Sequence, residues 1–273
     1  AYVQATRSLD AIARNAAADI HPPLYYWALR VWRALTGDSE WALRALSALA
    51  STLTVALVYR LGQRLYGVPV GLMAALFVAL NTFQIYYAQE ARMYALLALW
   101  AAASMWALMG LTLTDSPRAQ TRYAAALALL NAAGLWTQYV YPAIMVAQGL
   151  LFVLWMFGRA RNRQAFMPTL VRYVAANIIT IALFAVWIPT AWAQLTTWPN
   201  TGAPPLLGEQ LAVIGSYLTI GISASYAPFS VPTVFVLLLG LLILGQESRG
   251  RLAWWRMLVP VIWTLTLVSG FVA

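Results

Sequence analysis

Eight apolar stretches limit the possible folds of this chain more than any other feature. Most of them approach the ~20 residues that a helix needs to cross a bilayer. They occupy residues 40–65, 68–87, 94–113, 123–136, 141–157, 173–192, 231–245 and 258–273. Of the 273 residues, 62% are hydrophobic and 9% are charged, whereas about 25% of a soluble domain is charged. We therefore expect an all-α membrane protein, built as a bundle of about eight transmembrane helices.

The first 37 residues differ from these stretches, and we expect them to form interfacial helices on the outer side of the membrane. Residues 1–20 carry apolar side chains at helical spacing among charged ones. Residues 22–37 begin with two prolines, which suit the first turn of a helix, but this segment is too short and too charged to cross. The chain thus divides into an interfacial part, residues 1–37, and a transmembrane bundle, residues 38–273. Residues 206–226 could form a further interfacial helix.

Both ends of the sequence look incomplete. No signal peptide or first span precedes residue 1, and the last apolar stretch is still running at Ala273. We expect a fragment of a longer protein that lacks both termini, with an incomplete first outer loop and a truncated last span.

The loop charges predict the orientation of the chain. When the loops are assigned to alternating sides of the membrane, one side holds eleven arginines and two acidic residues, and the other holds six of each. The positive-inside rule places the arginine-rich side in the cytoplasm. We therefore expect a multi-pass protein of the cell membrane whose active site would lie on the extracytoplasmic side.

Composition excludes several other classes of protein. All 17 basic residues are arginines in short loops rather than on one basic face, so we expect no binding of nucleic acid. The absence of cysteine excludes disulfides, thiolate metal sites and a cysteine nucleophile. The sequence contains no glycine-rich phosphate loop, no Gly-x-Ser-x-Gly motif and no paired-histidine metal motif. A nucleotide-driven function is therefore not supported, and a requirement for a divalent metal stays open.

The densest polar cluster lies between the second and third predicted spans, in the run Tyr86-Tyr87-Ala88-Gln89-Glu90-Ala91-Arg92-Met93-Tyr94. In a continuous helix, Tyr86, Glu90 and Tyr94 would share one face, and Gln89 and Arg92 another. Charges at this depth are costly and usually face a cavity or each other. A carboxylate can act as a general base, and a guanidinium can bind phosphate. An interfacial ion pair within an aromatic belt is the alternative, but the density of polar groups favours a functional site.

Other polar residues on the same side are weaker candidates. His21, the only histidine, follows Asp19 by two residues and could contact a phosphate or sugar, or simply be exposed at a helix start. Arg44 follows Glu40 by four residues, a spacing that favours an ion pair over contact with a lipid phosphate. The third and fourth outward turns are marked by Gln138, Tyr139, Tyr141, Gln194 and Trp198.

Three motifs, taken in order and spacing, resemble those of a known group of enzymes. They are His21-Pro22-Pro23-Leu24-Tyr25-Tyr26-Trp27, Gly37-Asp38-Ser39-Glu40-Trp41-Ala42-Leu43-Arg44, and the run from Tyr86 to Tyr94 described above. With these motifs the chain resembles the bacterial glycosyltransferases of the C-type membrane fold, which are related to the protein O-mannosyltransferases and the lipid A aminoarabinose transferase. The resemblance covers most of residues 1–200.

The resemblance implies an enzyme that moves a sugar from a polyprenyl-phosphate donor to a lipid, glycan or protein acceptor, generally with inversion at the anomeric carbon. The partners that it implies are this donor, an unidentified acceptor and the lipid bilayer, and a divalent metal is neither implied nor excluded. Glu90 and Asp19 become the candidate catalytic bases, and Arg92 and His21 could stabilise the leaving phosphate. The candidate substrate-binding residues are His21, Arg44, Tyr86, Gln89, Arg92, Tyr94 and Tyr139.

This sequence departs from the family pattern at two places. The acidic Asp-Glu pair that holds the family's principal base would precede residue 1, and relatives often carry a histidine where Gln138 stands. Glu90 is therefore the best acidic candidate within the chain, and the fragment by itself could be inactive.

Two other classes of protein fit parts of the pattern. A transporter or flippase would carry charged residues at mid-span and broken helices in matched halves, whereas the charges here lie near the predicted membrane boundaries. A structural subunit that binds a lipid without turnover is compatible with the missing acidic pair.

Overall fold

The computed structural model describes residues 1–158 and 163–197, together with the single residues 209, 259 and 262. In the two continuous ranges every regular element is a helix and no strand occurs, which confirms the all-α prediction. The predicted spans at residues 231–245 and 258–273, and the possible interfacial helix at 206–226, fall almost entirely outside the described residues.

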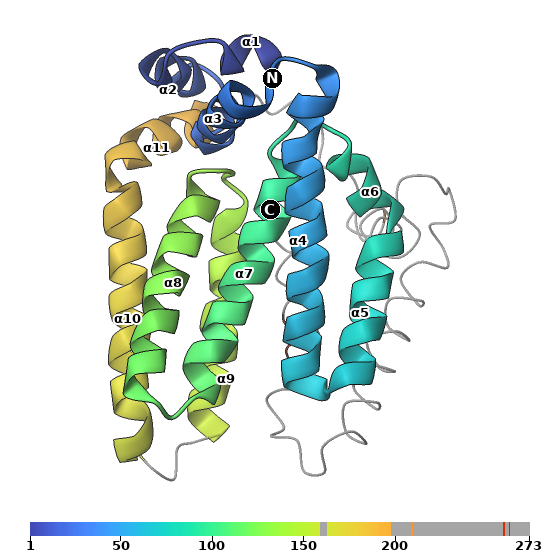
Figure 1. The fold of residues 1–273 in the computed structure, drawn as a ribbon. Coiled ribbons are helices and arrows are strands. Elements are labelled where there is room, and N and C mark those ends of the chain that lie inside the picture. The colour runs from blue at the N-terminus through green and yellow to red at the C-terminus, as the bar shows by residue number, and fades with distance from the viewer. Residues whose placement is uncertain (159–162, 198–208, 210–258, 260–261, 263–273) are drawn as a thin grey trace.

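Six helices run side by side as a bundle (Figure 1). They are α4 (Glu40–Tyr66), α5 (Val68–Leu80), α7 (Tyr94–Leu113), α8 (Pro117–Leu135), α9 (Tyr141–Gly158) and α10 (Arg163–Phe184). Four described helical runs are long and apolar enough to cross a membrane, and a fifth crossing results if α5 and the following α6 (Thr82–Ala88) count as one span. The described part of the chain is therefore a multi-span bundle.

The predicted span at residues 68–87 is broken. Its two parts, α5 and α6, meet at an angle of 61°. Asn81 lies at the break in an extended conformation, and its side-chain oxygen accepts a hydrogen bond from the Gln84 N–H at 3.0 Å. An asparagine in this position starts a new helix because its side chain replaces the missing backbone acceptor of the first turn.

Two other predicted spans were shorter than the helices that the structure shows. The helix that contains the fourth predicted span, α8, begins at Pro117 instead of residue 123, because Ser116 caps the helix and proline fits its first turn. It is not one of the four described runs that are long and apolar enough to cross a membrane. The sixth span extends as an apolar run from Phe166 to Thr197, in which α10 continues through a single 3-10 turn, η1 (Ala185–Trp187), into α11 (Ile188–Thr197). Hydropathy missed these ends because polar residues in the terminal turns of a helix resemble loop residues.

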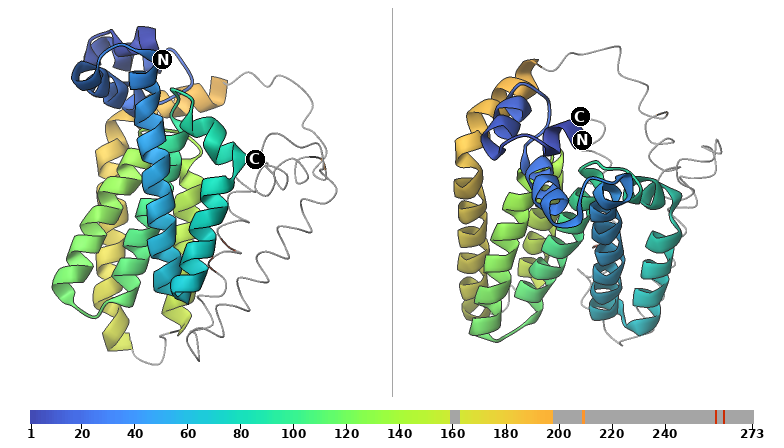
Figure 2. Two further views of the ribbon diagram at one scale, coloured as in Figure 1. Left: turned by 45° about the vertical axis from the view of Figure 1, so that its right-hand side comes forward. Right: turned by 45° about the horizontal axis from the view of Figure 1, so that its top comes forward.

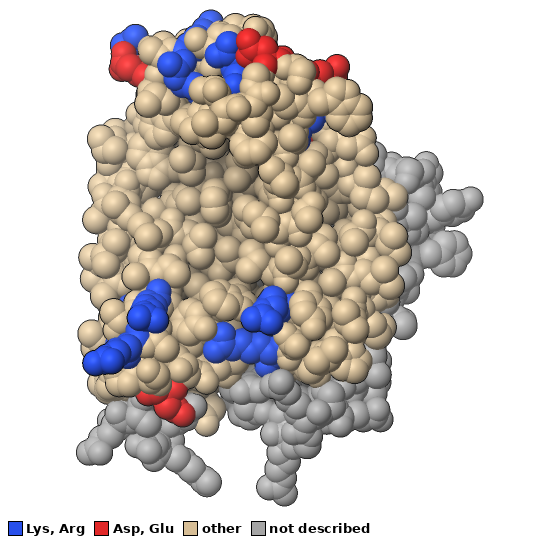
Figure 3. Space-filling model, viewed as in Figure 1, with Lys and Arg blue, Asp and Glu red and all other residues tan. Residues whose placement is uncertain are grey.

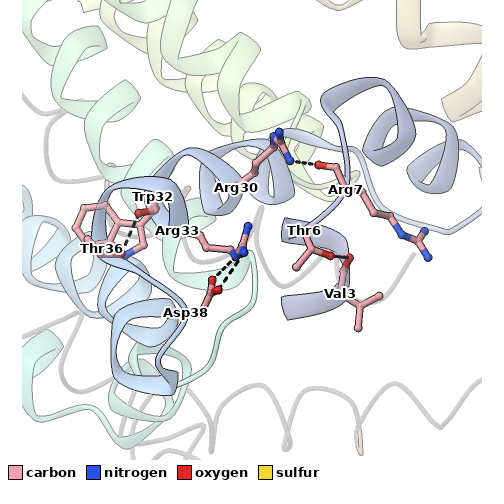
Figure 4. Close-up of polar contacts among 8 residues, drawn as sticks. All are labelled: Val3, Thr6, Arg7, Arg30, Trp32, Arg33, Thr36 and Asp38. Carbon is pink, nitrogen blue, oxygen red and sulfur yellow. Dashed lines mark hydrogen bonds and ion pairs between the residues drawn. The ribbon is translucent and has the colours of Figure 1, made fainter.

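Three short helices lie across one end of the bundle, which we call the capped end (Figures 1 and 2). They are α1 (Tyr2–Ala5), α2 (Leu9–Ala17) and α3 (Leu24–Thr36). A guanidinium N–H of Arg30 in α3 donates to the Arg7 carbonyl, which ties α3 to the α1–α2 connection (Figure 4). At the end of α3, Arg33 forms an ion pair with Asp38. The first contact joins α3 to α1 and α2, and the second fixes the connection from α3 into α4.

Charged side chains gather at the two ends of the described molecule, and the face seen in Figure 3 is uncharged between them. On α4, Arg44 and Arg60 are the boundaries of this belt; they are 16 residues apart, or about 24 Å at 1.5 Å per residue. That length approaches the ~30 Å hydrocarbon core of a bilayer. The end opposite the capped end, which we call the arginine-rich end, holds the described charges Arg60, Arg64, Asp115, Arg118, Arg122 and Arg172.

A buried polar network holds α7, α8 and α9 together within this uncharged belt. Gln148 donates to Ser104 at 2.9 Å and exchanges hydrogen bonds with Asn131, while the Tyr141 hydroxyl contacts both Ser104 and Asn131. All four side chains are completely buried. The Tyr141 ring packs directly on Gly134, where an added Cβ would lie 2.1 Å from a ring carbon. These hydrogen bonds and this close packing therefore fix how α7, α8 and α9 are rotated and shifted against one another.

Candidate functional site

A pocket of about 430 Å³ opens at the capped end of the molecule. It is formed by the start of α1, the first turn of α4 and the connection between α6 and α7. Its lining residues are Tyr2, Glu40, Leu43, Arg44, Tyr86, Gln89, Glu90, Ala91 and Arg92. The structure thus brings five of the candidate residues into one pocket, although Arg44 lies more than 40 positions before the others in the sequence. Sequence reasoning missed Tyr2 and Leu43, which carry no polar pattern of their own.

The connection that carries most of these residues is not helical. Helix α6 ends at Ala88 and α7 begins at Tyr94, so the face that Tyr86, Glu90 and Tyr94 would share in a continuous helix does not form. Instead the chain turns tightly, and the Arg92 N–H donates to the Glu90 carbonyl at 2.8 Å. In a helix, four successive side chains would project in different directions around the axis. In this turn, the consecutive residues Gln89, Glu90, Ala91 and Arg92 all line the pocket.

The backbone of Arg92 is anchored while its side chain stays accessible. The buried Ser47 on α4 donates to the Arg92 carbonyl at 3.5 Å, and the next residue, Met93, is itself buried. The Arg92 side chain is 64% exposed. An anchored backbone with an exposed guanidinium is suited to contact a ligand that enters from outside.

Two ion pairs line the pocket. The Nε of Arg92 lies 3.2 Å from a carboxylate oxygen of Glu90, which is 32% exposed. Arg44 pairs with Glu40 one helical turn away, as the spacing predicted. A guanidinium carries five N–H donors, so a single ion pair leaves Arg92 with capacity for an anionic ligand. The pocket therefore contains both positively charged hydrogen-bond donors, the arginines, and negatively charged acceptors, the glutamates.

A second group of side chains lies beside the pocket, and we call it the histidine cluster: Asp19, His21, Tyr26 and Gln138. Burial lowers the pKa of His21 below its usual 6.5, and Arg92 lowers it further, whereas Asp19 and a hydrogen bond with Gln138 raise it. The Nδ1 atom of His21 is buried and has no hydrogen-bond partner within the described residues. His21 is thus close enough to Arg92 to sense its charge, and it is held mainly neutral at neutral pH.

Two tyrosines of α3, Tyr26 of this cluster and its neighbour Tyr25, lie between the cluster and the pocket, and the sequence-based site did not include them. Burial raises the pKa of the Tyr25 hydroxyl, which lies beside Ser47. Burial also raises the pKa of Tyr26, with a further increase from Asp19 and an opposing effect of Arg92. Their position four and five residues after His21, within the first motif, is the signal that could have identified them.

Two candidate residues lie apart from the pocket. The Tyr139 hydroxyl accepts a hydrogen bond from Trp187 at 2.9 Å and donates to Gln194. The Tyr94 ring packs against Tyr87 with a centroid distance of 4.4 Å. Neither residue lines the pocket. Among the described residues, no group of three or more histidine, cysteine or acidic side chains could hold a metal ion.

These features define a class of protein: a polytopic helical membrane protein with a polar pocket at the membrane boundary. Residues 20–192 match the family model described as dolichyl-phosphate-mannose-protein mannosyltransferase. The chain belongs to this family, which confirms the resemblance drawn from the three motifs. Among curated protein sequences, none matches this chain significantly.

The fold also matches two crystal structures of ArnT from Cupriavidus metallidurans, one in the apo state and one bound to undecaprenyl phosphate. Each match has a TM-score of 0.58 and 16% sequence identity, and it covers 95% of this chain and 53% of ArnT. The likeness shows a common fold, and this chain spans about half the length of that protein.

Proposed function

We propose that this chain forms part of a membrane glycosyltransferase that moves a sugar from a polyprenyl-phosphate donor to an acceptor. The observation that carries the proposal is the pocket at the capped end, where the accessible Arg92 guanidinium lies beside the Glu90 carboxylate. Membership of the mannosyltransferase family and the undecaprenyl phosphate bound by the ArnT structure support this reading.

The two residues have complementary roles in such a reaction. A phosphate is a competent leaving group, so it needs stabilisation of its negative charge more than a proton, and Arg92 supplies this. The acceptor hydroxyl needs a base, and Glu90 is the carboxylate in the pocket closest to Arg92. When the donor phosphate takes the guanidinium of Arg92, it weakens the 3.2 Å ion pair and frees Glu90 to accept a proton. Asp19 is the alternative base, from the histidine cluster.

The reaction is a single displacement. The acceptor hydroxyl attacks the anomeric carbon, the bond from this carbon to the phosphate oxygen breaks, and the base takes the hydroxyl proton. One displacement inverts the configuration at the anomeric carbon. A lipid, a glycan or a protein could each supply the hydroxyl.

The pocket opens on the extracytoplasmic side in this proposal. Over the whole sequence, the loops assigned to the side of the arginine-rich end hold eleven arginines and those assigned to the side of the pocket hold six, and the positive-inside rule assigns the side with more arginines to the cytoplasm. In the described spans the charges lie at the two ends, which fits an enzyme at the membrane boundary better than a transporter with a charged mid-membrane site.

A turnover assay tests the activity. The full-length protein is incubated in membranes with a panel of undecaprenyl-phosphate-linked sugars, and release of free undecaprenyl phosphate is measured, because this product reports transfer to any acceptor. We expect release by the wild type and loss of most of it in Glu90→Gln and Arg92→Ala. Arg14→Ala is the matched control, since Arg14 is also exposed and ion-paired at the capped end but does not line the pocket. Wild-type turnover in both pocket variants would refute the proposal.

Cysteine labelling tests the orientation independently. This chain has no cysteine, so a cysteine introduced at one exposed position provides a single reactive thiol. We expect a membrane-impermeant maleimide to label Gln89→Cys in intact cells and to label Arg122→Cys only after the membrane is opened. The reverse pattern would place the pocket in the cytoplasm.

A further inference from the structure

Gln194 on α11 makes an unusual set of hydrogen bonds at the capped end. Its side-chain amide nitrogen donates to the carbonyls of Ala16 at 2.7 Å, Ala17 at 3.0 Å and Asp19. The residue is 8% exposed, so these bonds are shielded from water. Three acceptors from one short segment therefore converge on one side chain that lies about 175 positions later in the chain.

The position of these acceptors explains why such a donor matters. Helix α2 ends at Ala17, and the last carbonyls of a helix have no partner within the helix. The Ala16 carbonyl accepts from the Asp19 N–H at 3.2 Å. Gln194 adds a second donor to Ala16, supplies one to Ala17, and also holds the Asp19 carbonyl just beyond the helix end. The path of the chain from α2 into the histidine cluster is thus set by a side chain of α11.

Gln194 is itself held in place from its other side. Its side-chain oxygen accepts a hydrogen bond from the Tyr139 hydroxyl, which in turn accepts from the indole N–H of Trp187 at 2.9 Å. Trp187 and Ala191 pack in the same buried cluster as Ala16. The donor is therefore preorganised, because every polar atom of the Gln194 amide has a partner and the surrounding side chains are closely packed.

A second anchor holds the far end of the same segment. The Leu24 N–H at the start of α3 donates to the Trp136 carbonyl at the end of α8, at 3.1 Å. The Trp27 and Trp136 rings pack next to this bond, with centroids 5.5 Å apart. Residues 19–23, which include Asp19 and His21, are consequently fixed at one end by hydrogen bonds to α11 and at the other by a hydrogen bond to the end of α8.

We infer that Gln194 is a positioning residue, which clamps the end of α2 so that Asp19 and His21 are held beside the pocket that contains Arg92. This inference rests on the proposed function for its catalytic consequence, but the clamp itself is a structural statement. It also accounts for the position of Tyr139, which supports Gln194 instead of lining the pocket.

The test compares two buried glutamines at opposite ends of the bundle. Gln194→Met keeps the length and approximate volume of the side chain but removes every hydrogen bond. Gln194→Glu keeps the acceptor for Tyr139 but replaces the donating nitrogen by a carboxylate oxygen, which repels the three carbonyl oxygens. Gln120→Met is the matched control, because Gln120 is 9% exposed and its amide nitrogen also donates to a carbonyl, that of Thr114, at the arginine-rich end.

Hydrogen–deuterium exchange of the full-length protein measures the clamp directly. We expect the amides of residues 16–21 and of Leu24 to exchange at least about tenfold faster in both Gln194 variants, since local opening then costs less free energy. In Gln120→Met they should exchange as in the wild type. Unchanged exchange in the Gln194 variants, or an equal increase in Gln120→Met, overturns the inference.

Kinetics separate positioning from a general loss of structure. In the Gln194 variants we expect kcat to fall by about ten- to a hundredfold, because misplaced groups at a reacting centre have effects of this size. The Kd for undecaprenyl phosphate should stay within about twofold of the wild type, because the Arg92 turn is anchored by α4 and not by α11. A parallel loss of binding and turnover contradicts a positioning role. If the wild type transfers no sugar, the proposed function fails, and the exchange experiment still decides whether Gln194 is a clamp.

Discussion

Replacing Arg92 by alanine should separate ligand binding from stability. The Arg92 side chain is 64% exposed, and among the described residues its ion pair is with the partly exposed Glu90. Exposed ion pairs contribute about 0–1 kcal/mol to folding stability. The backbone anchor of Arg92, the hydrogen bond from Ser47 to its carbonyl, does not depend on its side chain. The variant should therefore fold normally, with a melting temperature close to that of the wild type.

The effect on binding should be much larger. A hydrogen bond to a charged group is worth about 1.5–3 kcal/mol, and alanine removes the guanidinium that would make it to a lipid phosphate. Since about 1.4 kcal/mol corresponds to a factor of ten, the Kd for undecaprenyl phosphate should rise by about ten- to a hundredfold. Arg92→Lys should fall between the two, because lysine keeps the charge but loses the planar fork.

The assay is equilibrium binding of undecaprenyl phosphate to the detergent-purified full-length protein, with a thermal melt of each variant as a check of folding. Arg14→Ala serves as the control, because Arg14 forms a similar exposed ion pair with Asp10 outside the pocket. A folded Arg92→Ala protein whose Kd stays within about twofold of the wild type would show that the phosphate does not bind here.

Three further predictions concern stability, each measured as the thermal unfolding of the purified protein. Burial lowers the pKa of His21 in the folded protein, so the unfolded chain binds a proton at this residue more readily. The free energy of unfolding should therefore not depend on His21 above about pH 6.5, and it should fall as the pH drops below that value. The variant His21→Gln should lose this pH dependence. Gly134→Ala should destabilise the bundle by about 1–3 kcal/mol, since the new Cβ would collide with the fully buried Tyr141 ring; an unchanged melting temperature would show that the ring can move. Gln148→Leu should cost about 1–3 kcal/mol, because it leaves the buried Asn131 amide without its acceptor; a more stable variant would contradict this account.

Much of the site was visible in the sequence because its elements are local. Five candidate residues, Arg44, Tyr86, Gln89, Glu90 and Arg92, line one pocket, and four of them come from a single run of seven residues. The ion pair between Glu40 and Arg44 follows directly from their spacing on one helix. The face that Tyr86, Glu90 and Tyr94 would share in a continuous helix does not form, because a helix end and a tight turn separate them. The spacing of residues predicts which side chains share a face only where the secondary structure is the same along the whole run.

Residues that act through distant contacts were not predictable in the same way. Gln194 is one polar residue near the end of an apolar run, and nothing in the sequence marks Ala16, Ala17 and Asp19 as its partners. The network of Ser104, Asn131, Tyr141 and Gln148 presents the same difficulty, since each is an isolated polar residue within or beside an apolar stretch. Their roles depend on how three helices are rotated and shifted against one another, and hydropathy contains no information on that register.

The sequence by itself therefore determined that this is an all-α membrane bundle with one arginine-rich end, and it identified the polar run between Tyr86 and Tyr94. Transfer from water to lipid depends on each segment's own composition, so these properties can be read one stretch at a time. Only the tertiary structure decided the break at Asn81, the grouping of Arg44 with Arg92, and the clamp by Gln194. These depend on where helices end and which faces meet, because hydrogen bonds and close packing act over a few ångströms between segments far apart in the chain.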